Sequence, residues 1–261
     1  MLNKRIVCFL LVILLLIPAA VVQAAVVVDK SQLESGVVSV NYDTAKDVSF
    51  KVMVNKGSHV YYYDLDESSI VPLQMGNGDY EISVLENITG NRYRIVKRER
   101  VTAKLTNENS VYLQSMQLIS WNEDMDVIKK AEELTIDAKN EQEKFKAVYD
   151  YVVENIKYDY QKYSKLNSDY IPSVEDVVKE GKGICYDYAV LTAAMLRSIG
   201  VPTKLIMGYK AGLKEYHAWN QVYLDDKWIT VDTTLDAVLV QGNRTPQIEK
   251  DSTLYSTSKE Y

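Results

Sequence analysis

The fold is decided by residues 181–200, which have the sequence GKGICYDYAVLTAAMLRSIG. The interior of this stretch is apolar on nearly every side, which is typical of a helix buried at the centre of a domain. Gly200 suits the position just after a helix, and Pro202 prevents the helix from continuing. The pattern therefore predicts a central buried helix from Cys185 to Ile199.

Cys185 lies in the first turn of this predicted helix. There, unpaired backbone N–H groups and the positive end of the helix dipole favour a thiolate over a thiol. The preceding glycines, Gly181 and Gly183, let the backbone approach a substrate closely and leave a backbone N–H for an oxyanion. Burial as a small apolar residue is the ordinary role of a lone cysteine, and it needs none of these features. We therefore predict that Cys185 is a nucleophile.

The first 24 residues have the pattern of a secretory signal peptide. A basic start with Lys4 and Arg5 precedes an apolar run over residues 6–17, and a region of small residues ends at Ala24. The apolar run has 12 residues, whereas about 20 are needed to span a bilayer. We expect cleavage after Ala24, no membrane span afterwards, and a secreted or extracytoplasmic location at the cell surface or cell wall. An uncleaved N-terminal anchor is the alternative.

Cleavage would leave Cys185 as the only cysteine, because Cys8 lies in the signal peptide. A mature chain with one cysteine cannot close an internal disulfide, so the thiol is free or pairs with another molecule. The chain has two histidines, His59 and His217, which are far apart in the sequence. This set falls short of any zinc site, and no calcium-loop spacing occurs, so we expect no metal and no other cofactor.

The composition argues against a nucleic-acid partner. The chain has 30 basic and 36 acidic residues, a net charge of −6, and it would carry −8 without Lys4 and Arg5. An acidic chain with runs of mixed charge is poorly suited to nucleic acid. The roughly 237 residues after cleavage suffice for one large or two ordinary domains, and a hydrophobic content of 47% supports a substantial core.

Residues 25–118 have the pattern of an antiparallel, β-sandwich-like domain. Segments rich in valine and tyrosine alternate partly between apolar and polar residues, with turn sequences such as Gly76-Asn77-Gly78 between them. Tyr61, Tyr62 and Tyr63 are expected to serve packing rather than binding, because aromatic residues are enriched in strands. The predicted strands are Val37–Tyr42, Val48–Val54, Val60–Leu65, Tyr80–Leu85, Arg92–Val96 and Val111–Leu118.

Helical patterns begin after Trp121, so a second, catalytic domain is predicted over residues 119–261. One helix is expected over Asp124–Ala138. A second follows the capping sequence Asn140-Glu141-Gln142-Glu143 and places its apolar residues on one face. A short third helix begins after Ser173 and ends near Gly181.

A predicted β-hairpin brings a histidine and an aspartate together. Strands are expected over Lys204–Tyr209, Tyr216–Leu224 and Trp228–Thr234, with Asp225-Asp226 as the hairpin turn. Pairing of Leu224 with Lys227 would fix the register. His217 then lies opposite Thr234 and diagonal to Asp232, at a Cα distance of about 7–8 Å. The other face is apolar and is expected to pack inward; it carries Ala218, Val222, Leu224, Ile229 and Val231.

Cys185, His217 and Asp232 form a candidate catalytic triad. In such a triad the cysteine attacks a carbonyl carbon, the histidine activates the thiol and later delivers a proton, and the aspartate orients the imidazole. Three residues in this order also arise by chance. The specificity of the prediction therefore depends on the residues around them.

Five sequence blocks within residues 140–236 resemble bacterial members of the transglutaminase-like superfamily. In order, they are GICYDYA at 183–189, LRSIGVP at 196–202, GY at 208–209, HAW at 217–219 and WITVDTT at 228–234. The resemblance implies an α+β fold with a papain/transglutaminase-like core, in which a cysteine-bearing helix packs on an antiparallel sheet. It also implies Cys185 as nucleophile, His217 as general base and Asp232 as the group that orients it.

The chain departs from the family pattern in two places. Thr233 follows Asp232 where many members have proline. The glutamine-tryptophan context of animal transglutaminases is absent around Cys185, so protein cross-linking does not follow from the resemblance.

These observations predict an exported enzyme that transfers acyl groups from protein or peptide amides through a thioester at Cys185. The acceptor can be an amine, as in a transglutaminase, or water, as in a cysteine protease or amidase, because both reactions use the same thioester. The expected partner is an extracytoplasmic protein or peptide substrate, and the sequence leaves the oligomeric state open. The alternatives are a non-catalytic cell-surface binding module, and a Cys185 that forms an intermolecular disulfide.

Other residues near the predicted site have structural explanations. Trp219 and Trp228 are expected in the core or in the wall of a cleft, because large aromatic residues dominate burial. Asp187 and Tyr188 fit helix capping or packing as well as a place beside the site.

The second oxyanion donor is left open among Tyr158, Tyr160 and Gln142. His59, in the β domain, is expected to have no catalytic part.

Overall fold

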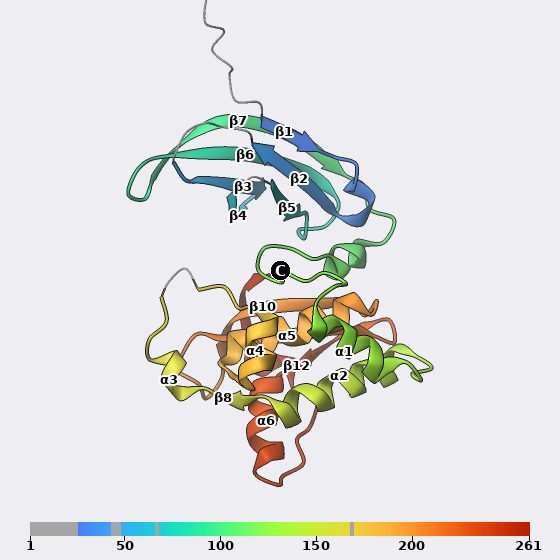
Figure 1. Cartoon of the computed structure of the whole chain (residues 1–261). Coiled ribbons are helices and arrows are strands. Elements are labelled where there is room, and N and C mark those ends of the chain that lie inside the picture. Colours follow the sequence, from blue (N-terminus) through green and yellow to red (C-terminus); the bar gives the residue numbers. More distant parts are fainter. Residues whose placement is uncertain (1–25, 43–47, 66–67, 168–169) are drawn as a thin grey trace, which may run out of the picture.

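The computed structural model describes residues 26–42, 48–65, 68–167 and 170–261 (Figure 1). The predicted signal peptide, residues 1–24, lies outside these ranges. Within them, no helix is both long enough and apolar enough to cross a membrane. The fold is mixed α+β: antiparallel sheets come first, and helices with a further antiparallel sheet follow.

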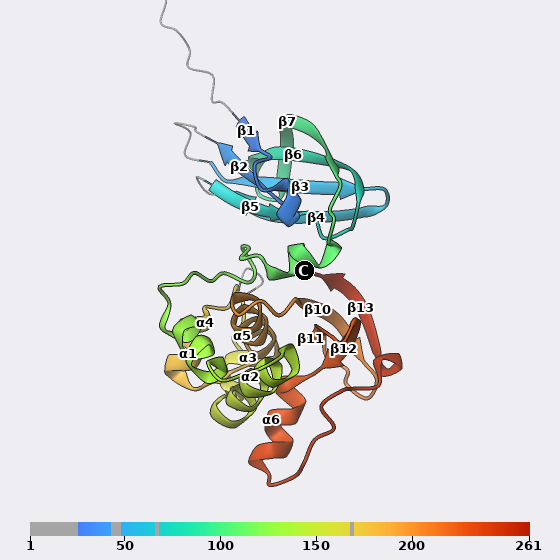
Figure 2. The same cartoon turned by 90° about the vertical axis from the view of Figure 1, so that its right-hand side faces the viewer.

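The N-terminal part consists of two antiparallel sheets that face each other (Figures 1 and 2). One has the strand order β1 (Val26–Asp29), β2 (Val37–Tyr42), β5 (Ser68–Pro72). The other has the order β4 (His59–Leu65), β3 (Phe50–Lys56), β6 (Gly78–Thr89), β7 (Arg92–Ala103). Inward-facing residues such as Val38, Val52 and Ile82 are almost fully buried between the sheets. This is the expected sandwich-like arrangement.

The tyrosine run in β4 follows the alternation of a strand. Tyr61 and Tyr63 are buried in the sandwich core, whereas Tyr62 points outward and is 58% exposed. The prediction that this run serves packing is confirmed for the two buried rings.

The predicted strand Val111–Leu118 is wrong. Residues Glu108–Leu113 form a 3-10 helix, η2, which begins at Asn107, whose side chain accepts a hydrogen bond from the backbone of Asn109. Val111 and Tyr112 are buried in this helix. Their preference for strands is overridden by tertiary contacts, since the Tyr112 hydroxyl donates to the Gln74 carbonyl and to Glu260.

Helices α1 (Asp126–Thr135), α2 (Glu141–Asn155) and α4 (Val174–Glu180) follow the predicted pattern. Asn140 caps α2 by accepting a hydrogen bond from Glu143 N at 2.9 Å. Ser173 caps α4 in the same way, and Gly181 ends α4 with a left-handed φ of 62°.

Helix α5 (Cys185–Ser198) is the buried centre of the C-terminal part, as predicted. It packs against a sheet with the strand order β12 (Lys227–Val231), β11 (His217–Leu224), β10 (Thr203–Lys210), β13 (Tyr255–Glu260), in which every pair is antiparallel. Figure 2 shows the helices on one side of this sheet. The structure therefore has a cysteine-bearing helix packed on an antiparallel sheet.

The predicted register of the β11–β12 hairpin is confirmed. Leu224 pairs with Lys227, and Asp225 and Asp226 form a two-residue turn with φ values of 49° and 59°. The apolar face of the hairpin is buried, as expected.

The last predicted strand, Trp228–Thr234, is too long. Strand β12 ends at Val231, and Asp232 caps a new helix, α6 (Thr233–Gln241), by accepting a hydrogen bond from Leu235 N at 3.2 Å. Asp232 is thus the first residue after the strand rather than part of it.

The two parts of the chain meet around η2 and β13, and Tyr261 lies between them (Figure 2). The buried guanidinium of Arg197, in α5, donates to the carbonyls of Gln114, Thr203 and Tyr261 at 2.8–2.9 Å. A cleft of ≈ 810 Å³ lies beside this contact and contains none of the three predicted catalytic residues.

Candidate active site

Cys185 is the first residue of α5 and is 8% exposed. The turn that holds it is fixed by Asp187, whose Oδ2 accepts a hydrogen bond from Ile184 N at 2.7 Å. Asp187 is fully buried, and Lys162 Nζ lies 2.9 Å from the same oxygen. The Tyr170 hydroxyl donates to the other oxygen. Asp187 therefore caps the helix, one of the two roles expected for it, and also ties the loop before α4 to the cysteine turn.

Gly183 is required by this packing. A Cβ atom at Gly183 would lie 2.6 Å from Asp187 Cβ, closer than real Cβ contacts allow. Residues Lys182–Gly183 form the short strand β9, which pairs in parallel with β8 (Lys157–Tyr158), so that Tyr158 lies opposite Gly183. The close approach of the backbone thus brings Tyr158 to the cysteine turn.

His217 and Asp232 are joined by a hydrogen bond. His217 Nε2 lies 2.8 Å from Asp232 Oδ2, and the two side chains are 6% and 0% exposed. Asp232 Oδ2 also accepts a hydrogen bond from the Tyr255 hydroxyl at 3.0 Å. The carboxylate is therefore held by groups from three elements: β11, α6 and β13.

Cys185 lies close enough to the imidazole for its sulfur to raise the pKa of His217, and the two side chains line the same cavity. Because Nε2 faces Asp232, Nδ1 is the nitrogen left for the sulfur. The structure therefore brings all three predicted residues together in the order cysteine, histidine, aspartate.

The charge state of His217 follows from these contacts. Burial by itself lowers the pKa of His217, but its hydrogen bond to Asp232 and its interaction with Cys185, together with the charges of both groups, raise it more. The result is a pKa of about 9 in place of the ordinary 6.5. At neutral pH the imidazole is accordingly protonated in the resting protein.

A cavity of ≈ 300 Å³ opens at the sulfur and is lined by Cys185, His217 and side chains from β8, α3 (Tyr160–Tyr163), α6 and the loop before β11. Its walls are largely apolar and aromatic, as is typical of a ligand pocket. A substrate that reaches the sulfur enters through this cavity.

The three candidates for the second oxyanion donor differ in position. Gln142 is excluded, because its amide donates to Asp225 at the far end of the hairpin. Tyr158 and Tyr160 both line the cavity. Burial and the charge of Cys185 raise the pKa of Tyr158 to about 12, so its hydroxyl keeps its proton and can donate.

The aromatic residues near the site pack as expected. Trp219 is 1% exposed and stacks on the His217 ring at a centroid distance of 6.2 Å. Trp228 packs against Tyr112 and Tyr223, both at 5.2 Å, away from the sulfur. Tyr188 is fully buried in the core of the C-terminal part.

Sequence reasoning missed Tyr255. It lies in β13, a strand of mostly polar residues. This strand pairs with β10, whose residues lie 45 or more positions earlier in the sequence. The segment STSKE after Tyr255 has no apolar face, so it carried no strand signal.

The chain is similar to known proteins over its C-terminal part. Residues 128–233 match the model of the transglutaminase-like superfamily. UPF0252 protein MJ1282 of Methanocaldococcus jannaschii is 33% identical over 92 residues, which is 31% of this chain and 26% of that protein. Kyphoscoliosis peptidase of Mus musculus is 29% identical over 118 residues, which is 41% of this chain and 18% of that protein. The chain thus spans about a quarter or less of the length of these two curated relatives.

Two solved structures are similar to it. The crystal structure of a TGase has 26% identity and a TM-score of 0.34, covering 41% of this chain and 30% of that chain. A proposed cysteine protease from Cytophaga hutchinsonii has 17% identity and a TM-score of 0.44, covering 86% of this chain and 83% of that chain. By the match to the family model, residues 128–233 are a transglutaminase-like core, a type of domain found in transglutaminases and cysteine peptidases.

Proposed function

We propose that this protein is a cysteine-dependent acyltransferase that acts on protein or peptide amides through a thioester at Cys185. The observation that carries the proposal is the hydrogen-bonded pair of His217 and Asp232 beside Cys185, with Cys185 and His217 lining one cavity. A buried structural cysteine would not need a histidine with a raised pKa beside it.

The first half-reaction is acylation. The Cys185 thiolate attacks the amide carbonyl carbon, and the carbonyl becomes a tetrahedral oxyanion. The backbone N–H of Cys185 and the Tyr158 hydroxyl are the candidate donors to that oxyanion. The C–N bond then breaks, His217 delivers its proton to the departing amine, and a thioester remains on the sulfur.

The second half-reaction returns the enzyme to its starting state. Neutral His217 takes a proton from water or from an amine, which attacks the thioester carbonyl and releases the thiolate. Asp232 holds the imidazole in one orientation and stabilises its charged form throughout, and Tyr255 holds Asp232. Water gives a peptidase or amidase, and an amine gives a transglutaminase.

The decisive experiment traps the thioester. Purified protein is mixed with a glutamine-containing peptide library and a dye-labelled primary amine, quenched in acid and analysed by mass spectrometry. We expect an acyl adduct on the peptide that contains Cys185, followed by amine incorporation or by cleavage or deamidation. Cys185→Ala should abolish both with the circular dichroism spectrum unchanged. Equal turnover by Cys185→Ala would overturn the proposal.

Export is part of the same proposal and rests on the pattern of residues 1–24. Sequencing the N-terminus of protein recovered outside the cytoplasm should give Ala25 as the first residue. Recovery of the intact N-terminus in the cytoplasmic fraction alone would contradict it.

A further inference from the structure

The cavity at Cys185 has an unusual lining beyond the reacting pair. Four tyrosines line it, Tyr158 and Tyr160 from the β8–α3 segment, Tyr163 from the end of α3, and Tyr216 just before β11. One carboxylate, that of Glu215, joins them. Among the described residues of the lining, Glu215 is the only acid, and the remaining wall consists of Thr234 and three aliphatic residues, Leu213, Leu235 and Val238.

The tyrosine rings are not simply core residues. Tyr160 is 75% exposed, Tyr216 46% and Tyr163 43%. Large aromatic side chains left open to solvent around a nucleophile indicate a surface that is covered when another molecule binds. The faces of such rings carry partial negative charge and attract cations.

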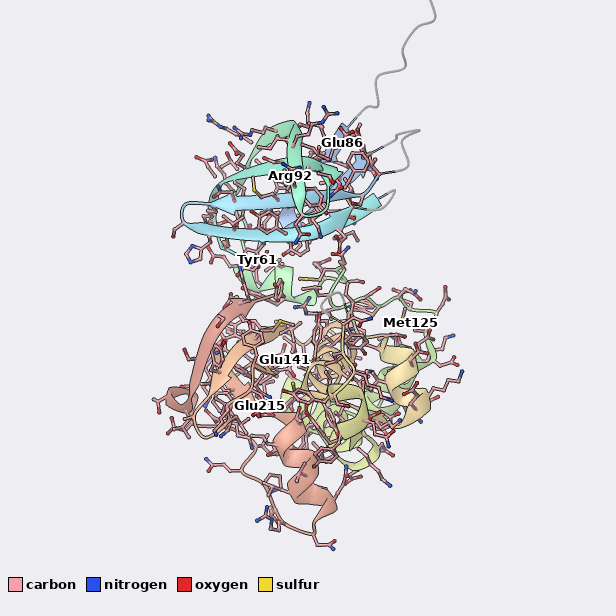
Figure 3. The ribbon with its side chains drawn as sticks, turned by 90° about the vertical axis from the view of Figure 1, so that its left-hand side faces the viewer. Tyr61, Glu86, Arg92, Met125, Glu141 and Glu215 are labelled. Atoms are coloured by element: carbon pink, nitrogen blue, oxygen red, sulfur yellow. The ribbon has the colours of Figure 1, made fainter. Side chains whose placement is uncertain are left out.

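Glu215 has no cationic partner within the described part of the chain. Its carboxylate accepts a hydrogen bond from the backbone N–H of Lys214 at 3.2 Å. Two nearby lysines have other partners. Lys162, which lies in the sequence between the lining residues Tyr160 and Tyr163, pairs with Asp187. Lys210 lies over the Tyr255 ring. Glu215 is close enough to act electrostatically on Tyr158, so its charge reaches the sulfur side of the cavity. Figure 3 shows Glu215 in the C-terminal part of the molecule, well below Tyr61 of the sandwich.

The charge of the reacting groups does not cancel that of Glu215. A thiolate and an imidazolium sum to zero, as do a thiol and a neutral imidazole. The cavity therefore keeps the negative charge of Glu215, an exposed residue at its wall, in either state of the pair.

We propose that this tyrosine-lined pocket selects a cationic group of the substrate, the ammonium of lysine or the guanidinium of arginine, with Glu215 as the residue that determines specificity. The proposal rests on the proposed acyl transfer at Cys185. The cation pairs with the Glu215 carboxylate while its aliphatic stem lies along the tyrosine rings. A bound substrate that covers the exposed rings would exclude water there and strengthen a pair that is weak on an open surface.

A cationic group can reach the pocket from two sources. It can belong to the acyl donor, as a basic side chain near the amide that is attacked, or it can be a second, charged group on the amine that attacks the thioester. The chemistry of recognition is the same in both cases. Separate experimental arms distinguish them.

The donor arm uses two short peptidyl chloromethyl ketones that alkylate Cys185 and differ only in carrying lysine or norleucine beside the ketone. Norleucine keeps the stem and lacks the charge. We expect the lysine probe to react about tenfold faster with the wild-type protein. Glu215→Gln should remove most of that preference, and Glu215→Lys should reverse it.

The matched control is Asp226→Asn. It removes one exposed carboxylate from the hairpin turn, about 25–30 Å along β11 from His217. Its selectivity should equal that of the wild type. Selectivity that falls equally in Asp226→Asn and Glu215→Gln would show a general effect of protein charge and would overturn the proposal.

The acceptor arm measures incorporation of a labelled diamine and of its neutral hydroxyl analogue into a neutral acyl donor. A raised KM for the diamine in Glu215→Gln, with kcat unchanged, would place the cation on the acceptor. A changed alkylation preference alone would place it on the donor.

Iodoacetamide labelling near pH 6 separates failure of this proposal from failure of the proposed function. If Cys185 reacts with iodoacetamide faster than a model thiol, while both probes and both acceptors are insensitive to Glu215→Gln, the pocket proposal is wrong and the enzyme proposal stands. If Cys185 is no more reactive than a model thiol, the nucleophile itself is wrong, and the pocket proposal falls with it.

Discussion

The sandwich and the C-terminal part are both well packed, but they differ in the side chains they bury. In the described part of the sandwich, Glu86 is the only buried residue among the aspartates, glutamates, lysines, arginines and histidines, and it pairs with Arg94. The C-terminal part buries six: Asp159, Asp187, Arg197, His217, Asp232 and Asp236. A buried charge is costly unless it is paired and hydrogen-bonded. In the described residues, buried charged side chains are therefore concentrated in the part around α5. There, each of them supports the cysteine turn, the histidine or a junction between segments.

The largest expected effect comes from removing the charge beside His217. Asp232→Asn should keep the shape of the side chain and lower kcat/KM in the acyl-transfer assay by about 10²- to 10⁴-fold, because the imidazole loses the partner that orients and charges it. Glu86→Gln is the matched control in the sandwich and should leave the activity unchanged. Equal losses in the two variants would break the contrast between the two parts.

The second effect is a dependence of stability on pH. The folded-state pKa of His217, about 9, is above the unfolded value near 6.5, so protonation stabilises the fold. This stabilisation is fully present below about pH 6.5 and is lost as the pH rises to 9. It amounts to roughly 3–4 kcal/mol. Urea titrations of the wild type and His217→Gln at several pH values should show the difference in unfolding free energy shrinking across this window. A constant difference would contradict the charged imidazole.

A third effect tests the packing below Cys185. Gly183→Ala should destabilise the protein by about 1–3 kcal/mol and loosen the cysteine turn, because the new Cβ meets Asp187. Gly181→Ala is the comparison: its left-handed φ of 62° costs roughly 1 kcal/mol, but its Cβ would meet only the Asn155 carbonyl oxygen, at an ordinary contact distance of 3.6 Å. Denaturant midpoints measure both, and iodoacetamide labelling rates should change only in Gly183→Ala. If the iodoacetamide labelling rate of Cys185 is unchanged in both variants, the packing at Gly183 does not affect the nucleophile.

The smallest effect concerns a contact that links β13 to the site. Tyr255→Phe removes one hydrogen bond to Asp232 and keeps the ring. We expect kcat to fall about 3- to 10-fold with little change in KM or unfolding free energy. A loss as large as that of Asp232→Asn would mean that Tyr255 acts directly on the substrate.

The sequence predicted the parts of the fold that depend on local signals. Helix α5 was predictable from its apolar interior and its Gly200 and Pro202 boundary, and the β11–β12 register from a two-residue turn. The contact between His217 and Asp232 followed from that register. The candidate nucleophile, base and orienting residue were therefore within reach of the sequence.

The rest depended on tertiary contacts. The segment Thr233–Gln241 contains valine and threonine, which favour strands, yet it is helical because Asp232 caps it and its inner face packs on the core. Residues Glu108–Leu113 form η2 because the Tyr112 hydroxyl finds its partners in Gln74 and Glu260, the latter 148 positions away. Strand β13 and Tyr255 were missed for the same reason, since a polar strand is recognisable only beside its neighbour.

The position of β13 has a consequence for the order in which the molecule is built. Ribosomes make the chain from its amino end, and the sandwich and α5 are complete before Tyr255 has been added. Until β13 joins the edge of β10, Asp232 lacks one of its donors and Arg197 lacks the Tyr261 carbonyl. The nascent protein thus carries the nucleophile before its catalytic support is complete, and full reactivity requires the later docking of β13 on β10.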